Sequence, residues 1–279
     1  MPGTLYLCAT PIGNLGDITL RCLETLKLAD LILAEDTRQT RKLLSHFQIH
    51  TPLRSFHAHN EQGRADEVIE RLQRGETIAL VSDAGLPLIS DPGAALVRAV
   101  QEAGLAVTCL PGASAPLTAL LLSGIQPLPF CFLGFLPRQG KARRQILQDW
   151  QGRPETLVIF EAPHRLLETL TALTEVFGPR EAAVCRELTK LHEEARRAPL
   201  PELLEHYRQQ APRGEITLVI AGADASLPRV KPAADPLELQ AAYAALQAEG
   251  LSRKEIFAQL QTRYELSRNE LYSRLQQDE

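Results

Sequence analysis

The sequence lacks several features that would assign the protein to a specialised class. It has five cysteines but no Cys-x-x-Cys pair, and most of these cysteines lie inside apolar runs. Scattered thiols of this kind are typical of a reducing compartment, where they pack in the core. There is also no excess of positive charge, since 34 Asp and Glu outnumber 30 Lys and Arg. The net charge of −4 argues against a general basic coat for nucleic acid, while local basic patches stay open.

Long apolar runs and a secretory leader are missing as well. No apolar stretch approaches the roughly 20 residues that cross a bilayer, and residues 1–4 lead directly into a strand-like pattern. The composition, 44% hydrophobic and 23% charged, is ordinary for a globular protein, and 279 residues suffice for two compact domains. We therefore expect a soluble, cytoplasmic protein without a membrane-spanning segment.

The first 112 residues alternate apolar runs with amphipathic segments. Strands are predicted over 4–10, 30–36, 53–58, 77–83 and 106–112, and helices over 17–28, 61–74 and 92–104, with a further helix that carries Arg38, Arg41 and Lys42. Asp17 is expected to cap the first helix. Apolar strands separated by helices indicate a parallel sheet that is covered on both faces. The fold class is therefore α/β.

The pattern changes after Ser114, which is expected to cap a short apolar helix. Four more strands are predicted near 130–137, 155–163, 181–188 and 215–222, with helices near 140–150, 163–177 and 200–210. We expect a first α/β domain over 1–112 and a second, mixed-sheet α/β domain over 113–222. Residues 223–236 are rich in Pro, Ala and Asp and indicate a linker. Residues 237–279 contain three short helical patterns, which predict either a helix-turn-helix or a small bundle.

The segment SDAGLPLISDPG, residues 82–93, follows a predicted parallel strand. Ligands of open α/β folds bind outside the carboxyl ends of strands, so this loop is well placed for function. A metal site would need more ligands than Asp83 and Asp91. The prolines favour a rigid wall of a cofactor pocket, with Asp83 facing the ligand and Asp91 capping the next helix.

Other short motifs give weaker signals. The glycines of TLYLCATPIGNLGD, residues 4–17, fall short of a dinucleotide fingerprint, although Glu35 and Asp36 end the next strand where a ribose-binding acid would lie. Pro11 also lacks the amide hydrogen that a pyrophosphate needs. His57 and His59 lack a third zinc ligand nearby. The basic cluster 138–144, RQGKARR, is interpreted as a solvated helix face, and no Ser-His-Asp order is visible.

Seven segments occur in a characteristic order: ATPIGNLGDIT, AEDTR, FHAHNE, SDAGLPLISDPG, PGASA, FEAPHR and RELTKLHEE. Together they resemble the ribosomal RNA small subunit methyltransferase I family, which belongs to the tetrapyrrole-methylase-like class of S-adenosylmethionine enzymes. The resemblance covers about residues 4–222, and the C-terminal helices resemble the family's helix-turn-helix appendage. The family often has a small polar residue at the position of Leu86 and a second proline at that of Ala113.

The resemblance implies two α/β domains of the tetrapyrrole methylase type, with S-adenosylmethionine in the cleft between them, plus a small C-terminal helical domain. It implies a homodimer that needs no metal and methylates the ribose 2′-oxygen of a cytidine in the decoding region of 16S rRNA. The residues implied to line the cofactor pocket are Pro11, Ile12, Asp83, Leu86, Ser114, Ala115, Phe160, Glu161, Leu188 and Ile216.

Methyl transfer to a ribose hydroxyl also requires a proton acceptor. We expect Asp36 or His57 in this role and Arg38 on a flanking phosphate, the alternative being an Asp36–Arg38 pair that merely stiffens the loop. Glu187 and Lys190 are the next candidates. Two rival functions stay open: a nicotinamide-dependent oxidoreductase and a methylase of porphyrinoid rings.

Overall fold

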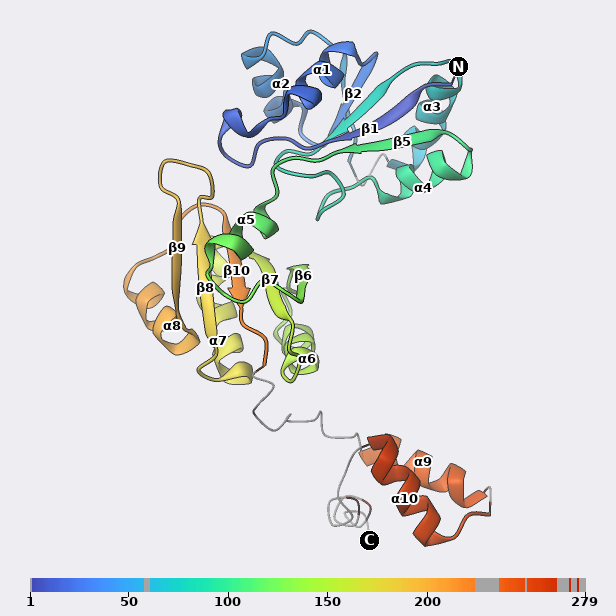
Figure 1. Ribbon diagram of the computed structural model, residues 1–279, viewed down its shortest axis with the longest axis vertical. Helices are drawn as coiled ribbons and strands as arrows, with labels where there is room; N and C mark the ends of the chain where they lie inside the picture. Colours follow the sequence, from blue (N-terminus) through green and yellow to red (C-terminus); the bar gives the residue numbers. More distant parts are fainter. Residues whose placement is uncertain are drawn as a thin grey trace.

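The computed structural model describes residues 2–57, 61–223, 236–248, 250–264, 271 and 275 (Figure 1). Its first sheet is wholly parallel, with the strand order β3-β2-β4-β1-β5. The strands are β1 (Thr4–Cys8), β2 (Leu31–Ala34), β3 (Leu53–Ser55), β4 (Ile78–Val81) and β5 (Ala106–Leu110). The parallel sheet predicted from the apolar runs is therefore present.

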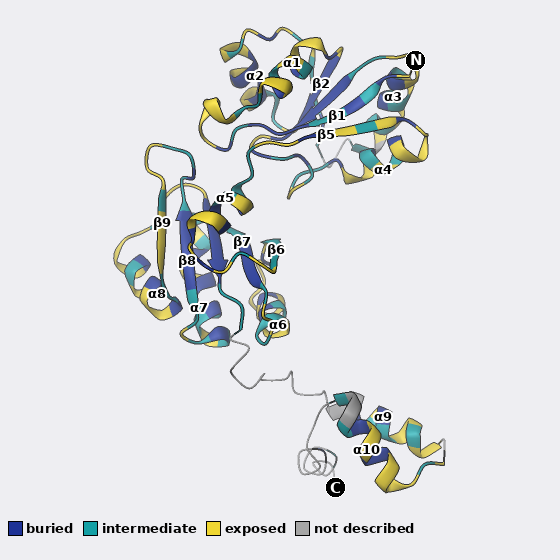
Figure 2. Cartoon of the chain, viewed as in Figure 1, coloured by how far each residue is buried: buried dark blue, intermediate teal, exposed yellow. Residues whose placement is uncertain are grey.

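Four helices cover the two faces of this sheet. They are α1 (Leu20–Leu28), α2 (Thr37–His46), α3 (Glu61–Gln73) and α4 (Ala94–Glu102). One face packs on α1 and α2 through a cluster that includes Leu26 and Leu44, and the other packs on α3 and α4 through Leu72 and Leu96. Both faces of β2 and β4 are thus buried (Figure 2), which explains why these strands read as continuous apolar runs.

The connections of β1 and β4 place a ligand site at one edge of the sheet. These strands are neighbours, yet the chain leaves β1 for α1 on one face and leaves β4 for α4 on the other. Their carboxyl-terminal loops therefore diverge and leave a crevice, the switch point at which open α/β sheets bind ligands. The loop after β4 is the segment SDAGLPLISDPG.

The second sheet is mixed, with the order β6-β7-β10-β8-β9. Its strands are β6 (Phe130–Phe135), β7 (Thr156–Glu161), β8 (Glu181–Arg186), β9 (Glu194–Pro199) and β10 (Ile216–Ile220). One face packs on α6 (Gly140–Trp150), α7 (Leu166–Phe177) and α8 (Leu200–Gln209), and the other on α5 (Ala115–Leu122). The α/β class with two sheets is thus confirmed.

The sequence did not predict β9, and its composition explains why. This strand carries Arg196 and Arg197 and lies at the edge of the sheet, paired only with β8. Charged side chains are suited to an edge strand because they discourage further pairing. They also remove the apolar alternation by which strands are recognised.

Two expected helix caps are wrong. Asp17 lies in a 3₁₀ turn (Leu15–Asp17), and the hydroxyl of Thr19 caps α1 by accepting from the amide of Cys22 at 3.2 Å. Helix α4 has Gly93 at its N-cap without a side-chain bond. The amide of Leu96 instead donates to Glu61 Oε1 at 3.2 Å, so Glu61 takes the part expected of Asp91. Ser114 does precede α5, but its side chain makes no capping bond.

The C-terminal helices α9 (Pro236–Ala248) and α10 (Arg253–Tyr264) form a separate small core. Leu239, Phe257, Leu260 and Leu271 are buried in it, and Figure 1 shows the pair apart from the two sheets. Ser252 and Glu255 cap α10 reciprocally. The predicted linker and most of the third helical pattern lie outside the described residues. Within the described part of the chain, no helix is long and apolar enough to cross a membrane.

Candidate functional site

The loops after β1 and β4 are tied together at the switch point. Thr10 and Gly85 exchange two backbone hydrogen bonds, of 2.9 and 3.0 Å. The buried hydroxyl of Thr10 donates to the carbonyl of Ser82 at 3.0 Å, and that of Ser82 donates to the carbonyl of Gly85 at 3.1 Å. Farther along, Leu88 and Ser90 both have φ of 71°. Left-handed backbone at residues other than glycine is strained, and such strain concentrates at functional sites.

The two sheets contact each other beside this loop. Gly13 packs so tightly that a β-carbon there would lie 2.8 Å from the carbonyl oxygen of Leu188. The amide of Asn14 donates to the hydroxyl of Thr189 at 3.0 Å. Glu187 and Thr189 have positive φ values of 50° and 64°, so a strained turn of the second sheet closes this end of the interface.

A cavity of about 400 Å³, the cleft cavity, lies between the sheets. Its walls are largely apolar and come from both sheets: Ile12, Ile89, Ala115, Phe135, Phe160 and Ile216. The rings of Phe135 and Phe160 lie 5.5 Å apart. The volume falls in the range of about 300–1,000 Å³ that is usual for small-molecule sites. The cavity can therefore bury a ligand of cofactor size.

The charged side chains that line the cleft cavity are all acidic: Asp83, Asp91, Glu161 and Glu215. Two of them are neutralised locally. The buried Glu161 accepts from the amide of Ala162 at 2.8 Å and pairs with Arg165 at 3.5 Å, and Glu215 pairs with Lys190 at 3.0 Å. Asp83 and Asp91 keep their negative charge for the cavity.

Burial and repulsion by neighbouring acids raise the pKa of both aspartates. The pKa of Asp91 rises to about 6, first because the group is buried and then because Glu35 and Asp83 repel its charge, against a hydrogen bond from Ser82. Burial also raises the pKa of Asp83, although the amide of Asp36 donates to its Oδ1 at 3.1 Å. A carboxyl group with a pKa near 6 can gain or lose a proton close to neutral pH.

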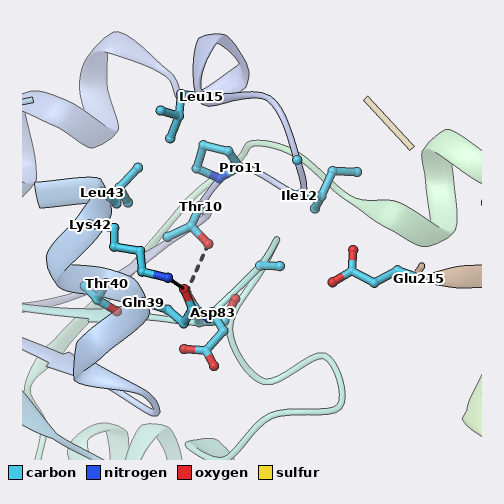
Figure 3. A pocket seen from close by; sticks show the side chains of 13 residues that line it. Thr10, Pro11, Ile12, Leu15, Gln39, Thr40, Lys42, Leu43, Asp83 and Glu215 are labelled. Atoms are coloured by element: carbon cyan, nitrogen blue, oxygen red, sulfur yellow. Dashed lines mark hydrogen bonds between the residues drawn. The ribbon is translucent and has the colours of Figure 1, made fainter. Parts of the chain in front are cut away.

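A second cavity, of about 450 Å³, opens on the other side of Asp83, and we call it the α2 pocket (Figure 3). It shares Ile12, Asp83, Ala84 and Glu215 with the cleft cavity. Its remaining lining residues come from the end of β1, the loop after it, helix α2 and Ser82, and they include Pro11, Leu15, Gln39, Thr40, Lys42 and Leu43. Figure 3 shows Lys42 and Gln39 extending from α2 toward Thr10 and Asp83.

The structure brings most of the expected cofactor residues to this place. Ile12, Asp83, Ala115, Phe160, Glu161 and Ile216 line the cleft cavity, and Pro11 lines the α2 pocket. Leu86, Ser114 and Leu188 line neither of the two cavities. Leu188 is buried in the core between α5 and the second sheet, and Leu86 is half-buried in the loop after β4.

The expected catalytic residues lie beside the cavities rather than in their walls. Asp36 caps α2, and its carboxylate accepts three bonds from Arg38, of 2.8, 3.0 and 2.8 Å. These bonds lower the pKa of Asp36 to about 2, which makes it a weak proton acceptor. The Asp36–Arg38 ion pair of the loop-stiffening alternative is therefore present, while the side chain of Arg38 is 84% exposed. His57 follows β3 and lines neither cavity.

The next candidates from the sequence, Glu187 and Lys190, also form an ion pair and line neither cavity. Lys190 Nζ donates to Glu187 Oε1 at 2.9 Å, and this pair lowers the pKa of Glu187. Both residues belong to the turn at the contact between the sheets. His59 lies outside the described residues. Within the described residues, no group of three His, Cys, Asp or Glu side chains is suited to hold a metal.

Sequence reasoning missed Asp91 as a cavity residue and the polar side chains of α2. The signal for Asp91 was present, since it lies in the same loop as Asp83. An aspartate before Pro-Gly and a helical pattern is, however, the usual sign of a cap. Gln39, Thr40 and Lys42 carried no signal beyond an ordinary helix surface.

Comparisons with known proteins find a matching family model and named relatives. Residues 4–204 match the family model described as Tetrapyrrole (Corrin/Porphyrin) Methylases. A ribosomal RNA small subunit methyltransferase I from Synechocystis sp. is 48% identical over 97% of this chain and 96% of its own length. Its namesake from Bacillus subtilis is 52% identical over 80% of this chain and 76% of its own length.

Solved structures share the fold at low sequence identity. Diphthine synthase aligns with a TM-score of 0.61 at 16% identity, over 78% of this chain and 90% of its own. Uroporphyrin-III-C-methyltransferase from Thermus thermophilus aligns with a TM-score of 0.53 at 19% identity, over 78% and 94%. At these identities the likeness concerns the fold alone.

Proposed function

The chain belongs to the ribosomal RNA small subunit methyltransferase I family of the tetrapyrrole methylases, and we propose that it methylates a cytidine in the decoding region of 16S rRNA. That it is a methyltransferase follows from the family. The donor we propose is S-adenosylmethionine, and the acceptor atom is the ribose 2′-oxygen. One observation carries the proposal: a cavity whose charged lining is wholly acidic adjoins a pocket that contains Lys42. A cationic donor matches the acidic cavity, and Lys42 gives an anionic acceptor one cation to contact in the adjoining pocket.

The cleft cavity fits the chemistry of the donor. S-adenosylmethionine carries a sulfonium and an ammonium group, and Asp83 and Asp91 are the acids free to face them. The apolar side chains Ile12, Phe160 and Ile216 suit the adenine and the thioether carbons. When bound, the sulfonium supplies a methyl group that is already activated, so the protein has to place the reactants in line and exclude water.

A nicotinamide dinucleotide fits the same cavity poorly. Its pyrophosphate is negative and is normally held by backbone amides at a helix N-terminus. Here Asp83 and Asp91 would repel it, and Pro11 lacks an amide hydrogen at the matching turn. A porphyrinoid substrate is the other rival. It is favoured by the description of the family model and by uroporphyrin-III-C-methyltransferase, a fold relative at 19% identity, whereas the relatives at 48% and 52% identity bear the name of an rRNA enzyme.

We assign proton removal to Asp91 rather than to Asp36 or His57. As the ribose oxygen bonds to the methyl carbon and the carbon–sulfur bond breaks, the hydroxyl proton must pass to a base, leaving a neutral sulfide. Asp91 lines the cavity and has a pKa of about 6, close to where a general base works best at neutral pH. Arg38 stays in the proposal as a contact to a phosphate beside the target nucleotide, because its guanidinium is exposed.

Exposed leucines on α5 support the proposed homodimer. The side chains of Leu117, Leu121 and Leu122 are 47%, 75% and 45% exposed on this short helix, whose exposed part is yellow in Figure 2. A cluster of exposed apolar side chains is typical of a subunit interface.

For the chain itself we propose domains 1–112 and 113–222, a linker over 223–236 and an RNA-contacting tail over 237–279. Ribosomal RNA as substrate places the enzyme in the cytoplasm.

Transfer of a labelled methyl group tests the function directly. Purified protein should bind S-adenosylmethionine in calorimetry but not NAD, and it should label 30S subunits that lack the modification. A 2′-O-methyl group protects one phosphodiester bond from alkali, so alkaline hydrolysis of the labelled RNA identifies both the atom and the nucleotide. Labelling of uroporphyrinogen in place of RNA would instead support a porphyrinoid substrate. Label on a base would disprove the assignment of the ribose 2′-oxygen as the acceptor atom.

A further inference from the structure

We infer that the α2 pocket receives the target nucleotide of the RNA, and that Gln39, Thr40 and Lys42 contact it. The inference rests on the proposed function, since it identifies where the RNA acceptor of that same site lies. None of these three residues belongs to the motif positions expected to bind the cofactor. They come from one helix, α2, which forms the side of the pocket away from the second sheet (Figure 3).

The position of the pocket is the first argument. It meets the cleft cavity at Ile12, Asp83, Ala84 and Glu215, which line both. A nucleotide in the α2 pocket therefore has its ribose within reach of a donor in the cleft cavity, with Asp83 at the boundary. Methyl transfer needs this arrangement, because the reacting atoms must come within about 3–3.5 Å of each other in line.

The shape and chemistry of the pocket suit a flipped-out base. Pro11, Leu15 and Leu43 supply apolar surfaces on which the faces of a ring can pack. Gln39 offers a carboxamide, which can both donate to and accept from the edge of a base. Enzymes that modify one nucleotide of a folded RNA read it in this way, between apolar walls and a few polar groups.

Lys42 supplies the positive charge that an RNA acceptor needs. Its Nζ donates to Gln39 Oε1 at 2.9 Å, and within the described residues it forms no ion pair. Its ammonium therefore keeps free donors for a phosphate or a base carbonyl. Asp83 and Glu215 line both cavities, whereas Lys42 lines only the α2 pocket and is the one cation among the described residues that line either of them. An anionic group in the α2 pocket would therefore lie toward α2, next to Lys42.

Thr40 gives an independent sign of a missing ligand. Thr40 is only 4% exposed and lines the pocket, yet its hydroxyl has no hydrogen-bond partner. A buried hydroxyl without a partner is unfavourable, and native proteins rarely keep one. A polar atom of the nucleotide would satisfy it. This predicts an unusual combination for Thr40→Val: no loss of thermal stability, because an unsatisfied group is removed, together with weaker RNA binding.

The test compares three variants with one matched control. Lys42→Met keeps the length of the side chain and removes the charge, Gln39→Ala removes the carboxamide, and Thr40→Val is isosteric. Arg41→Met is the control, because Arg41 is an exposed cation on the same helix that lines neither cavity. Each protein is assayed for binding of S-adenosylmethionine by calorimetry, for RNA binding by filter retention without donor, and for single-turnover methylation of 30S subunits.

We expect Lys42→Met and Gln39→Ala to lose at least about tenfold in kcat/KM on 30S subunits, as for loss of a contact to a charged or base group. Thr40→Val should lose about threefold to tenfold in RNA affinity. Donor affinity should change less than about twofold in all of them, and Arg41→Met should behave like the wild type. With a target-site uridine, the wild type should slow down, while Gln39→Ala should discriminate less between the two bases.

The outcomes separate this inference from the proposed function. Wild-type protein that labels no small-subunit RNA would remove the proposed function itself. If the wild type is active but the three variants match Arg41→Met in RNA affinity and rate, the α2 pocket is not the acceptor site. Loss of donor binding in Lys42→Met or Gln39→Ala would also overturn the inference, because it would assign the pocket to the cofactor.

Discussion

Replacing Asp91 by asparagine should make the donor-free protein more stable at neutral pH while removing most of its activity. Asp91 is half-buried in the cleft cavity beside Glu35 and Asp83, and its pKa rises from an ordinary 3.8 to about 6. The folded state therefore favours the neutral carboxyl group. Asparagine has nearly the same shape, keeps one side-chain oxygen as a hydrogen-bond acceptor, and carries no charge.

The sign and size of the effect follow from this pKa. Well below pH 4 the group is protonated in both the folded and the unfolded protein, so it adds no penalty. Between about pH 4 and 6 the unfolded protein releases the proton while the folded protein retains it, so stability is lost across this range. Above pH 6 the folded protein holds a charged carboxylate beside two others, and the loss is complete. The raised pKa corresponds to roughly 3 kcal/mol at most. Because water reaches part of the side chain, we expect about 1–2 kcal/mol at pH 7.5.

Urea unfolding of the wild type and Asp91→Asn between pH 4 and 8 measures this difference. Far-UV circular dichroism is the suitable probe, since the single tryptophan, Trp150, lies on α6 and reports only on the second sheet. The protein must be freed of donor, because a bound cation would offset the repulsion. Asp66→Asn, on the exposed surface of α3, controls for the loss of one negative charge.

The reasoning fails if Asp91→Asn is less stable than the wild type at pH 7.5, or if its gain does not shrink toward pH 4. A loss of stability in Asp91→Asn would show that the carboxylate of Asp91 stabilises the fold, as a helix cap does. Methylation supplies the second half of the test. If Asp91 accepts the proton, its replacement should slow single-turnover transfer by about 10²-fold or more, with RNA affinity unchanged.

Three further predictions follow from the site and from the surface. Asp83→Ala should weaken S-adenosylmethionine binding by about 1.5–3 kcal/mol in calorimetry. Asp83→Asn is the control, because it removes the charge but keeps the acceptor for the amide of Asp36. Unchanged affinity in both variants would remove Asp83 from the donor site. Deletion of residues 224–279 should leave donor binding and the thermal transition of the two sheets intact, because α9 and α10 have their own core, but should lower methylation of 30S subunits; full activity would deny the tail an RNA-binding role. Leu121→Glu should convert a dimer to a monomer in light scattering, whereas Leu167→Glu on α7, also an exposed leucine, should not.

The parallel sheet could be predicted because its sequence signals are local and strong. β2 and β4 are buried at every residue, so each reads as an unbroken apolar run. The loops that follow β1 and β4 are the expected ligand loops. β9 could not be predicted in this way. Its place at the edge of the second sheet, paired only with β8, requires no apolar pattern at all.

The site shows the same division between local and long-range information. Asp83 follows an apolar strand directly, so its place at the carboxyl edge could be predicted. The interpretation of Asp91 as a cap failed because α4 receives its cap from Glu61, 35 residues away from Leu96 in the sequence. The α2 pocket could not be predicted from the sequence for a similar reason. Gln39 and Lys42 look like solvated helix residues until Pro11 and Asp83 are placed opposite them.

The loop between β4 and α4 shows why this site is costly to the fold and yet persists. It holds Asp83 and Asp91 close enough to repel each other, and it keeps Leu88 and Ser90 in strained backbone. The paired bonds between Thr10 and Gly85 anchor its first turn to the end of β1, which fixes the backbone that carries Asp83. The proposed cationic donor would offset this repulsion, so part of its binding free energy would come from relief of the repulsion between the two acids. Asp91→Asn should remove the repulsion and weaken donor binding together.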